Sequence, residues 1–303
     1  MPWKELAGLL PAAAAPGAGW GLTSMSECYN PSMSLHWPGI LVRGAEIVAE
    51  YQGGVTLRQL FYRLLSEQLI PNTRSAYQVL SDRTAAARRA GRFPRLIDQT
   101  RAIGEHPSWE GPAAALSALT RQYRRPRTEY QECALYLGAE KATMAALLEQ
   151  WFGELGIPVI LLRGYTSQSY IESIVDHAEA DGRQPVLIYA GDLDPSGEDI
   201  ERDFTQRAGS DWTVRRVAVT LEQIDRLGLV KLPGKKKDTR AEQFVGKYGR
   251  LFQVEIEAIE PNTLQDLYSQ VLFNYWDDEP YQAVLEQEGL DRIQLAGLTK
   301  YLD

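Results

Sequence analysis

The feature that most constrains the fold is a series of short apolar segments, separated by helical segments, that begins at residue 133. The apolar segments show no regular alternation of apolar and polar residues, which indicates strands that are buried on both faces. The strands are predicted at 133–137, 158–162, 185–189 and 214–219, and the helices between them at 142–155, 168–180 and 198–206. Buried strands joined by helices form a parallel α/β sheet.

Acidic side chains follow the ends of two of these strands. Glu140 comes just after the first strand, and Asp192 and Asp194 come just after the third. Because ligands of a parallel sheet bind beyond the carboxyl ends of its strands, the three carboxylates converge if these strands are neighbours. Carboxylates at that spacing repel one another and need a cation, and their hard oxygen atoms favour Mg²⁺, with Mn²⁺ as a substitute. The sequence therefore predicts Glu140, Asp192 and Asp194 as metal ligands.

The acidic residues also have plainer interpretations. An isolated Asp-x-Asp is typical of a loop that caps a helix, so Asp192 and Asp194 indicate a metal only together with Glu140. Glu255 and Glu257 alternate along a predicted strand, and they are either surface residues or an accessory acidic pair.

The charge of the chain is distributed unevenly. The 303 residues include 32 lysines and arginines and 40 acidic residues, and this net charge of −8 by itself argues against a nucleic-acid partner. Residues 58–127, however, contain thirteen arginines and no lysine against five acidic residues. A guanidinium group binds two phosphate oxygens at once, so this arginine block favours a nucleic-acid surface over a merely solvated helical face. Its arginines are Arg58, Arg63, Arg74, Arg83, Arg88, Arg89, Arg92, Arg95, Arg101, Arg121, Arg124, Arg125 and Arg127.

Two short helices are predicted inside the arginine block. Thr56 can cap a helix over 57–69, whose leucines and phenylalanine fall on one apolar arc. The turn at 70–73 ends this helix, and a second helix is predicted over 75–90. Two short helices that are joined by a tight turn and followed by basic residues are typical of a helix-turn-helix or winged-helix module.

Tyr62 falls off the apolar arc of the first of these helices, with Arg58 one turn before it. An exposed tyrosine on a helix is in most cases only a surface residue. A tyrosine beside an arginine also suits phosphoryl transfer to a phenol, because the arginine favours the phenolate and can bind the attacked phosphate. Tyr62 and Arg58 are therefore candidates for that chemistry.

Composition places the chain among soluble globular proteins. Hydrophobic residues make up 44% and charged residues 24%, which excludes a disordered, collagen-like or coiled-coil chain. Two cysteines, Cys28 and Cys133, cannot form a disulfide framework, and this favours a reducing cytosol. No uninterrupted apolar stretch reaches 18 residues, so no membrane span is expected.

The chain is predicted to have three parts. Residues 1–35 are rich in alanine, proline, glycine and serine and form a flexible N-terminal extension. The polar, proline-interrupted segment 124–127 marks a boundary near residue 128. A DNA-binding domain that carries Tyr62 is therefore expected at 36–127, and the α/β domain with a C-terminal extension at 128–303.

Two segments of the α/β half resemble a known family. Residues 135–140 (LYLGAE) and 191–200 (GDLDPSGEDI) resemble a Toprim domain, the metal-binding fold of topoisomerases, primases and related nucleases. The Asp-x-Asp-Pro-x-Gly-x-x-Ile form, preceded by Arg163-Gly164-Tyr165, is most similar to the A subunit of topoisomerase VI and to the meiotic double-strand-break transesterases. The resemblance covers about residues 50–275.

The resemblance implies a fold and a set of roles. In that family a winged-helix domain precedes the Toprim domain and carries a nucleophilic tyrosine with an arginine four residues earlier, a pattern that residues 56–62 (TLRQLFY) match. Tyr62 would attack a DNA phosphate and form a 5′-phosphotyrosyl link, and Arg58 would position the phosphate. Glu140 would act as general acid/base or metal ligand, and Asp192 and Asp194 would bind Mg²⁺. The implied Toprim domain has a mostly parallel sheet flanked by helices.

The resemblance also implies partners and a setting. Double-stranded DNA is the expected substrate, and a homodimer is expected because in the family the tyrosine of one protomer meets the Toprim site of another. The sequence contains no Gly-rich nucleotide loop, so strand passage driven by ATP would need a separate ATPase subunit of the B type. The chain is shorter than a full A subunit and more similar to small stand-alone versions found on mobile elements, with a cytoplasmic, nucleoid-associated location.

Two alternatives stay open. A hydrolytic Toprim nuclease, of the mobile-element or plasmid-defence kind, would use a metal-activated water in place of Tyr62, and a non-catalytic relative would only bind DNA. A nucleotide-binding oxidoreductase is disfavoured, because an acid stands where G-x-G-x-x-G would follow the first strand. A histidine-based metal site is disfavoured too, because His36, His106 and His177 lack the spacing of ligands.

Overall fold

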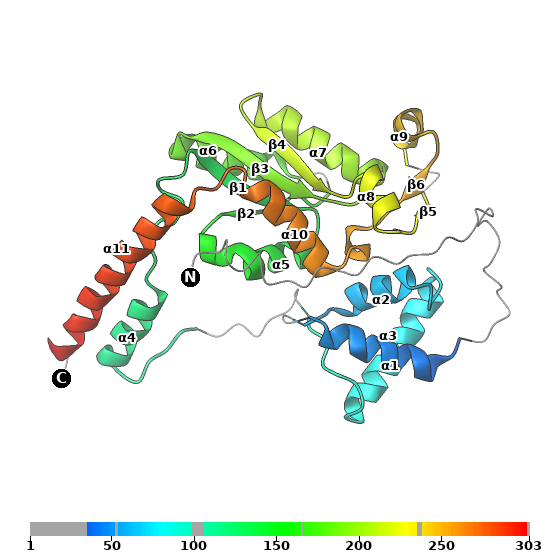
Figure 1. Ribbon diagram of the computed structural model, residues 1–303, viewed down its shortest axis with the longest axis horizontal. Helices are drawn as coiled ribbons and strands as arrows, with labels where there is room; N and C mark the ends of the chain where they lie inside the picture. The colour runs from blue at the N-terminus through cyan, green and yellow to red at the C-terminus, as the bar shows by residue number, and fades with distance from the viewer. Residues whose placement is uncertain (1–34, 52–53, 99–105, 165, 235–237, 302–303) are drawn as a thin grey trace, which may run out of the picture. The chain divides into compact units, whose positions relative to one another are not determined.

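A computed structural model describes residues 35–51, 54–98, 106–164, 166–234 and 238–301 of the chain (Figure 1). The predicted extension at 1–35 lies outside these residues except for Leu35, and Tyr165 of the family-like motif lies outside them as well. Residues 36–303 form one unit by their internal contacts.

Three helices form the first part of this unit. They are α1 (Trp37–Ala49), α2 (Leu57–Ser66) and α3 (Arg74–Arg89). α2 begins with a capping box, in which the Thr56 hydroxyl accepts from the Gln59 backbone N–H and the Gln59 side chain accepts from the Thr56 backbone N–H. It ends at Ser66 rather than at the predicted residue 69, because Gln68 adopts a left-handed φ of 58°.

The two predicted helices and the turn between them are therefore confirmed. No strand precedes β1 among residues 35–51, 54–98 and 106–132. A wing is a β-hairpin, so the winged-helix assignment stays a prediction.

The predicted parallel α/β sheet is confirmed. Its strands lie in the order β2-β1-β3-β4, and every neighbouring pair is parallel. The strands are β1 (Cys133–Ala139), β2 (Val159–Leu161), β3 (Gln184–Ala190) and β4 (Thr213–Ala218). The connections are α5 (Ala142–Phe152) with the short turn η2 (Gly153–Leu155), α6 (Gln168–Asp181) and α7 (Pro195–Ala208). Each boundary lies within three residues of its predicted place.

Helices cover both faces of this sheet (Figure 1). α5 and α10 (Pro261–Leu272) pack on one face with Leu135 and Leu137 of β1, and α6 and α7 pack on the other with Ala134 and Tyr136. Neighbouring side chains of β1 therefore enter two separate cores, which explains why the strand is apolar throughout.

The remaining elements flank the sheet. α4 (Pro112–Gln122) precedes it, and after β4 come α8 (Leu221–Arg226), β5 (Leu232–Pro233), α9 (Ala241–Tyr248), β6 (Phe252–Gln253), η3 (Ile256–Ala258), α10, α11 (Asp278–Gly297) and η4 (Leu298–Tyr301). β5 and β6 pair with each other as a second, antiparallel sheet. None of the helices in the described part of the chain is both long and apolar enough to cross a membrane.

The prediction that Glu255 and Glu257 lie on a strand is wrong. β6 ends at Gln253, Val254 makes a single bridge to Leu193, and the chain then turns into η3. The backbone N–H of Ile256 donates to the Asp192 carboxylate at 2.8 Å. Because the Asp192 side chain accepts the hydrogen bond from this N–H, the Ile256 backbone cannot donate to a neighbouring strand.

The segment predicted as a polar linker is anchored by ion pairs. Arg127 is only 6% exposed, and its guanidinium pairs with Glu288 of α11 at 2.7 Å. Arg124 pairs with Glu154 at 2.7 Å, and Arg125 lies 3.4 Å from the carboxylate of Asp291. The buried pair of Arg127 with Glu288 therefore anchors this segment to α11, while the more exposed pairs of Arg124 and Arg125 add little stability.

Candidate functional site

Glu140 and Asp192 meet because β1 and β3 are neighbours. The two strands pair in parallel with Ala139 opposite Ala190, so their carboxyl ends lie side by side. This is the point of the sheet where the order of strands reverses, and ligands of such sheets bind there. The backbone N–H of Asp192 donates to Glu140 Oε2 at 2.9 Å. The structure thus brings together two of the three predicted carboxylates.

Asp194 caps α7. Its carboxylate accepts from the backbone N–H of Gly197 at 2.7 Å, and Pro195 occupies the first position of the helix. The interpretation of Asp-x-Asp as a loop that caps a helix is therefore confirmed for Asp194. Asp192 instead accepts from Ile256 and from Lys141.

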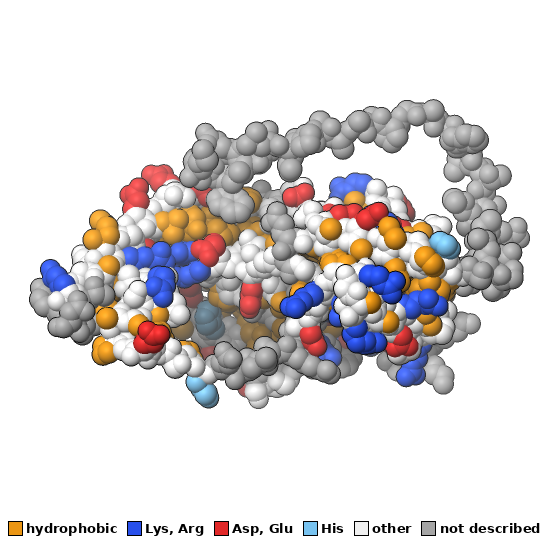
Figure 2. Space-filling view, turned by 90° about the horizontal axis from the view of Figure 1, so that it is seen from below, with side chains coloured by type: hydrophobic (Ala, Val, Ile, Leu, Met, Phe, Trp, Pro, Cys, Tyr) orange, Lys and Arg blue, Asp and Glu red, His pale blue; other side chains and the backbone are white. Residues whose placement is uncertain are grey.

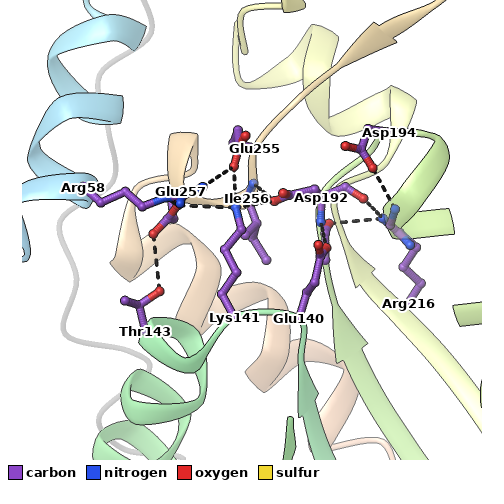
Figure 3. A network of polar contacts seen from close by, with 12 residues as sticks. Arg58, Glu140, Lys141, Thr143, Asp192, Asp194, Arg216, Glu255, Ile256 and Glu257 are labelled. Atoms are coloured by element: carbon purple, nitrogen blue, oxygen red, sulfur yellow. Dashed lines mark hydrogen bonds and ion pairs between the residues drawn. The ribbon is translucent and has the colours of Figure 1, made fainter. Parts of the chain in front are cut away.

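Arg216 of β4 fixes the loop that carries Asp192 (Figure 3). Its guanidinium donates to the carbonyl oxygens of Gly191 at 3.1 Å and Asp192 at 2.7 Å, and it pairs with Glu201 at 2.8 Å. The sequence pattern does not indicate this role, because it depends on β4 lying beside β3.

Two glycines allow the loop to pass close to Glu140. A Cβ at Gly191 would lie 2.4 Å from Tyr189 Oη and 3.0 Å from Glu140 Oε2. A Cβ at Gly197 would lie 2.3 Å from the carbonyl oxygen of Asp192 and 3.3 Å from Glu140 Oε2. A side chain at either position would therefore push the loop away from Glu140.

Replacing Gly197 with alanine is expected to lower the free energy of unfolding by about 1–3 kcal/mol, because the Asp192 carbonyl has to move. Gly289→Ala is the matched control, since a Cβ there meets nothing within 4 Å in the interior of α11. That control is expected to stabilise the protein by about 0.5–1 kcal/mol. Urea unfolding followed by circular dichroism measures both, and equal effects would contradict the close packing at Gly197.

The ammonium group of Lys141 lies among three carboxylates (Figure 3). Its Nζ is 2.8 Å from Asp192 Oδ1, 2.5 Å from Glu255 Oε2 and 3.3 Å from Glu257 Oε2. Lys141 thus supplies positive charge where the sequence predicts a metal ion. Sequence reasoning overlooks this residue, and its position directly after Glu140 is the signal that could have found it.

Glu255 and Glu257 connect this cluster to α2. Arg58 donates from Nε to Glu257 at 2.8 Å and from Nη2 to Glu255 at 3.2 Å. The Glu257 side chain is fully buried and also accepts from Thr143 at 3.3 Å. The interpretation of these acids as surface residues is therefore wrong, and their role as an accessory acidic pair stays a prediction. All of these contacts lie within one chain.

Tyr62 lies next to Arg58, as the helical spacing predicts. The guanidinium carbon of Arg58 is 5.5 Å from the centre of the half-buried Tyr62 ring. The Tyr62 hydroxyl has no hydrogen-bond partner among the described residues. The phenol therefore lies close enough to the acidic cluster for the charge of Glu255 to act on it, but no side chain in the described part of the chain accepts a hydrogen bond from it.

The environment of Tyr62 disfavours its phenolate. Burial, followed by the negative charge of Glu255, raises the pKa of Tyr62 to about 12. Arg58 and Lys141 act in the opposite direction and are outweighed. The expectation that Arg58 favours the phenolate is thus right in sign but wrong in its net result, and Tyr62 is protonated at neutral pH.

Burial also governs the carboxylates of the loop. It raises the pKa of Glu140, with further contributions from the charges of Asp194 and Glu255. It raises the pKa of Asp192 against the opposing charge of Lys141. Burial acts in the same direction on Glu255, but the charges of Lys141 and Arg58 outweigh it and lower the pKa of this residue. Burial therefore favours the protonated, neutral forms of Glu140 and Asp192, and the positive charge of Lys141 offsets this effect only in part.

The oxygen atoms at this loop suit a divalent metal ion. The carboxylates of Glu140 and Asp192 are hard ligands, and the buried hydroxyl of Tyr189, close to Gly191, has no hydrogen-bond partner within the described ranges of the chain. No group of three histidine, cysteine, aspartate or glutamate side chains that could hold a metal occurs in the part of the chain that the structure describes. A site built from Glu140, Asp192 and Asp194 therefore stays a prediction, and its donor chemistry fits Mg²⁺.

Ion pairs occupy part of the arginine block. Five of its arginines lie within 4 Å of a carboxylate: Arg58, Arg63, Arg124, Arg125 and Arg127. Seven others have no carboxylate partner among the described residues: Arg74, Arg83, Arg88, Arg89, Arg92, Arg95 and Arg121. Figure 2 shows basic side chains spread over the region of α1 to α3, at the right of the view. Arg101 lies outside the described residues.

A scan against models of protein families finds no match for this chain, and a search of curated proteins finds no match either.

Proposed function

We propose that this chain is a Mg²⁺-dependent DNA-cleaving transesterase, similar to the A subunit of topoisomerase VI, in which Tyr62 attacks a phosphate of double-stranded DNA. The observation that carries the proposal is the continuous set of polar contacts from α2 to the loop after β3. Arg58 stacks over the Tyr62 ring and pairs with Glu257, and Lys141 pairs with both Glu257 and Asp192. Metal-dependent cleavage by a tyrosine needs a phenol and a cluster of carboxylates in one neighbourhood.

The proposed step exchanges one phosphodiester for another. Tyr62 Oη forms a bond with phosphorus, the bond between phosphorus and the 3′ oxygen breaks, and the 5′ phosphate stays on the tyrosine. The phenolic proton leaves Tyr62, and one proton is added to the 3′ oxygen, which departs as a hydroxyl group. The resemblance makes Glu140 either the general acid/base of this proton transfer or a metal ligand. A divalent ion bound at Asp192 and Asp194, and at Glu140 where it is a ligand, would stabilise the charge on the leaving oxygen.

The unpaired arginines would bind the DNA backbone. Seven guanidinium groups without a carboxylate partner among the described residues would give an affinity that falls steeply with salt. A winged helix, an ATPase partner of the B type and a nucleoid-associated cytoplasmic location enter the proposal through the family resemblance alone. So does the homodimer, in which Tyr62 would meet the carboxylates of another protomer, whereas the contacts described above join α2 to the acidic cluster of its own chain.

Trapping DNA on the denatured protein tests the proposal. Supercoiled plasmid is incubated with the full chain and Mg²⁺ or Mn²⁺, the reaction is stopped with detergent, and the attached peptide is mapped by mass spectrometry. The expected peptide contains Tyr62. Strand breaks without any attached peptide would contradict the transesterase.

A hydrolytic Toprim nuclease is the second candidate, and one observation favours it. The Tyr62 phenol has a pKa of about 12 and contacts no base among the described residues, so it is a weak nucleophile in this arrangement. In that case an activated water molecule would attack the phosphate, and the products would carry a free 5′ phosphate. The peptide mapping described above distinguishes the two candidates.

A further inference from the structure

A hollow of about 350 Å³ opens beside Tyr62, between α2 and the beginning of α3. It is lined by Arg58, Phe61, Tyr62, Asn72, Thr73, Arg74 and Tyr77. Two guanidinium groups, two phenols, an amide and a hydroxyl therefore border one space. Their donors suit an oxyanion, and Tyr62 is the candidate nucleophile at its edge.

The two arginines of this hollow differ in their partners. Arg58 forms ion pairs with Glu255 at 3.2 Å and with the fully buried Glu257 at 2.8 Å. If Arg58 turned toward a phosphate, the buried carboxylate of Glu257 would lose part of the positive charge that balances it, and this would cost free energy. Arg74 is exposed and has no carboxylate partner among the described residues. Arg74 can therefore bind an anion without breaking an existing pair.

The position of Arg74 in α3 also lacks a structural reason. It is the first residue of the helix, directly after the Thr73 cap, where a positive side chain is unfavourable. A residue that is unfavourable at its position in a helix, and that makes no compensating contact in the fold, is a candidate for a functional role. The neighbouring Tyr77 is fixed by an edge-on contact between its ring and the ring of Phe61, with centres 5.2 Å apart.

We infer that this hollow binds the phosphodiester that Tyr62 attacks, and that Arg74 is the residue that positions the phosphate. The role that the helical spacing and the resemblance assign to Arg58 thus passes to Arg74, while Arg58 holds α2 against Glu255 and Glu257. The inference rests on the proposed function, which supplies the nucleophile and the DNA.

Arg74→Gln and Arg89→Gln form a matched pair for the test. Both residues are exposed arginines of α3 without a carboxylate partner among the described residues, but Arg89 lies at the other end of the helix and does not line the hollow. Each change removes one positive charge, so the general attraction to DNA falls equally. The measurements are the single-turnover rate of adduct formation, the Kd for a short duplex and the thermal midpoint.

Arg74→Gln is expected to slow adduct formation by about 100-fold relative to Arg89→Gln, since a positioned donor to the reacting group is lost. The Kd values and thermal midpoints of the two variants are expected to agree, and Arg74→Lys is expected to recover part of the rate. Equal rates in the Gln variants would overturn the inference.

If the unmodified chain forms no adduct, the proposed function fails, and calorimetric titration with inorganic phosphate still tests the hollow. Binding that is lost in Arg74→Gln and kept in Arg89→Gln supports the phosphate site. Equal binding in both variants, or no binding to the unmodified chain, overturns it.

Discussion

Replacing Tyr62 with phenylalanine is expected to abolish the covalent protein–DNA adduct and to lower the rate of strand cleavage by at least about 10³-fold, the scale of losing a nucleophile. The phenylalanine ring can keep the edge-on contact with Phe61, whose centre lies 5.6 Å away, and the stacking of Arg58. Only the attacking oxygen is removed, so the fold and the DNA affinity should be unchanged. Gel assays of supercoiled plasmid with Mg²⁺ or Mn²⁺ measure the cleavage, and denaturing electrophoresis measures the adduct.

Tyr130→Phe is the control for this substitution, because Tyr130 is 62% exposed and does not line the hollow beside Tyr62. It should cleave as the unmodified chain does. If Tyr62→Phe keeps its cleavage while Asp192→Asn loses it, the enzyme is a hydrolase. If the unmodified chain binds DNA but cleaves it with neither metal, and Asp192→Ala binds equally well, the chain is a non-catalytic DNA-binding relative.

Replacing Lys141 with methionine is expected to lower the free energy of unfolding by about 3–5 kcal/mol at neutral pH, because removing one member of a buried ion pair leaves the other uncompensated. The Lys141 side chain is 17% exposed, and its ammonium group contacts three carboxylates that are less exposed still. Methionine preserves the apolar stem and removes only the charge. Urea unfolding gives the change in free energy.

Divalent ions should oppose this loss. If the carboxylates around Lys141 can take up a cation, 10 mM Mg²⁺ will raise the thermal midpoint of Lys141→Met more than that of the unmodified chain. Lys247→Met is the control, since the pair of Lys247 with Glu198 lies at the surface and should change stability by less than about 1 kcal/mol. Suppose instead that Lys141→Met lowers the free energy of unfolding only slightly and that Mg²⁺ does not change its thermal midpoint. The ion pairs of Lys141 would then contribute little to stability, and the carboxylates around it would not bind a cation.

The sequence predicts the sheet and its carboxyl edge because both depend on local pattern and general topology. Apolar runs without alternation mark strands that two layers of helices bury, and β1 and β3 are such strands. Glu140 and Asp192 then meet because each directly follows one of two adjacent parallel strands. Capping residues such as Thr56 are equally visible in a short window of sequence.

The parts that escape prediction depend on contacts between distant segments. Lys141 and Glu255 are 114 residues apart in the chain, and Arg58 and Glu257 are 199 residues apart. No periodic pattern links such pairs. The strand predicted around Glu255 fails for the same reason, because the Asp192 carboxylate, 64 residues earlier, takes the N–H of Ile256.

The carboxylates of Glu255 and Glu257 each accept from Arg58 and Lys141 at the same time. This shared acceptance makes the two ends of the network thermodynamically linked. Loss of the positive charge at either end therefore strengthens the attraction of the shared carboxylates for the basic residue at the other end. By reciprocity this coupling has the same size in both directions, so the effects of replacing Arg58 and Lys141 on the free energy of unfolding are expected to be non-additive.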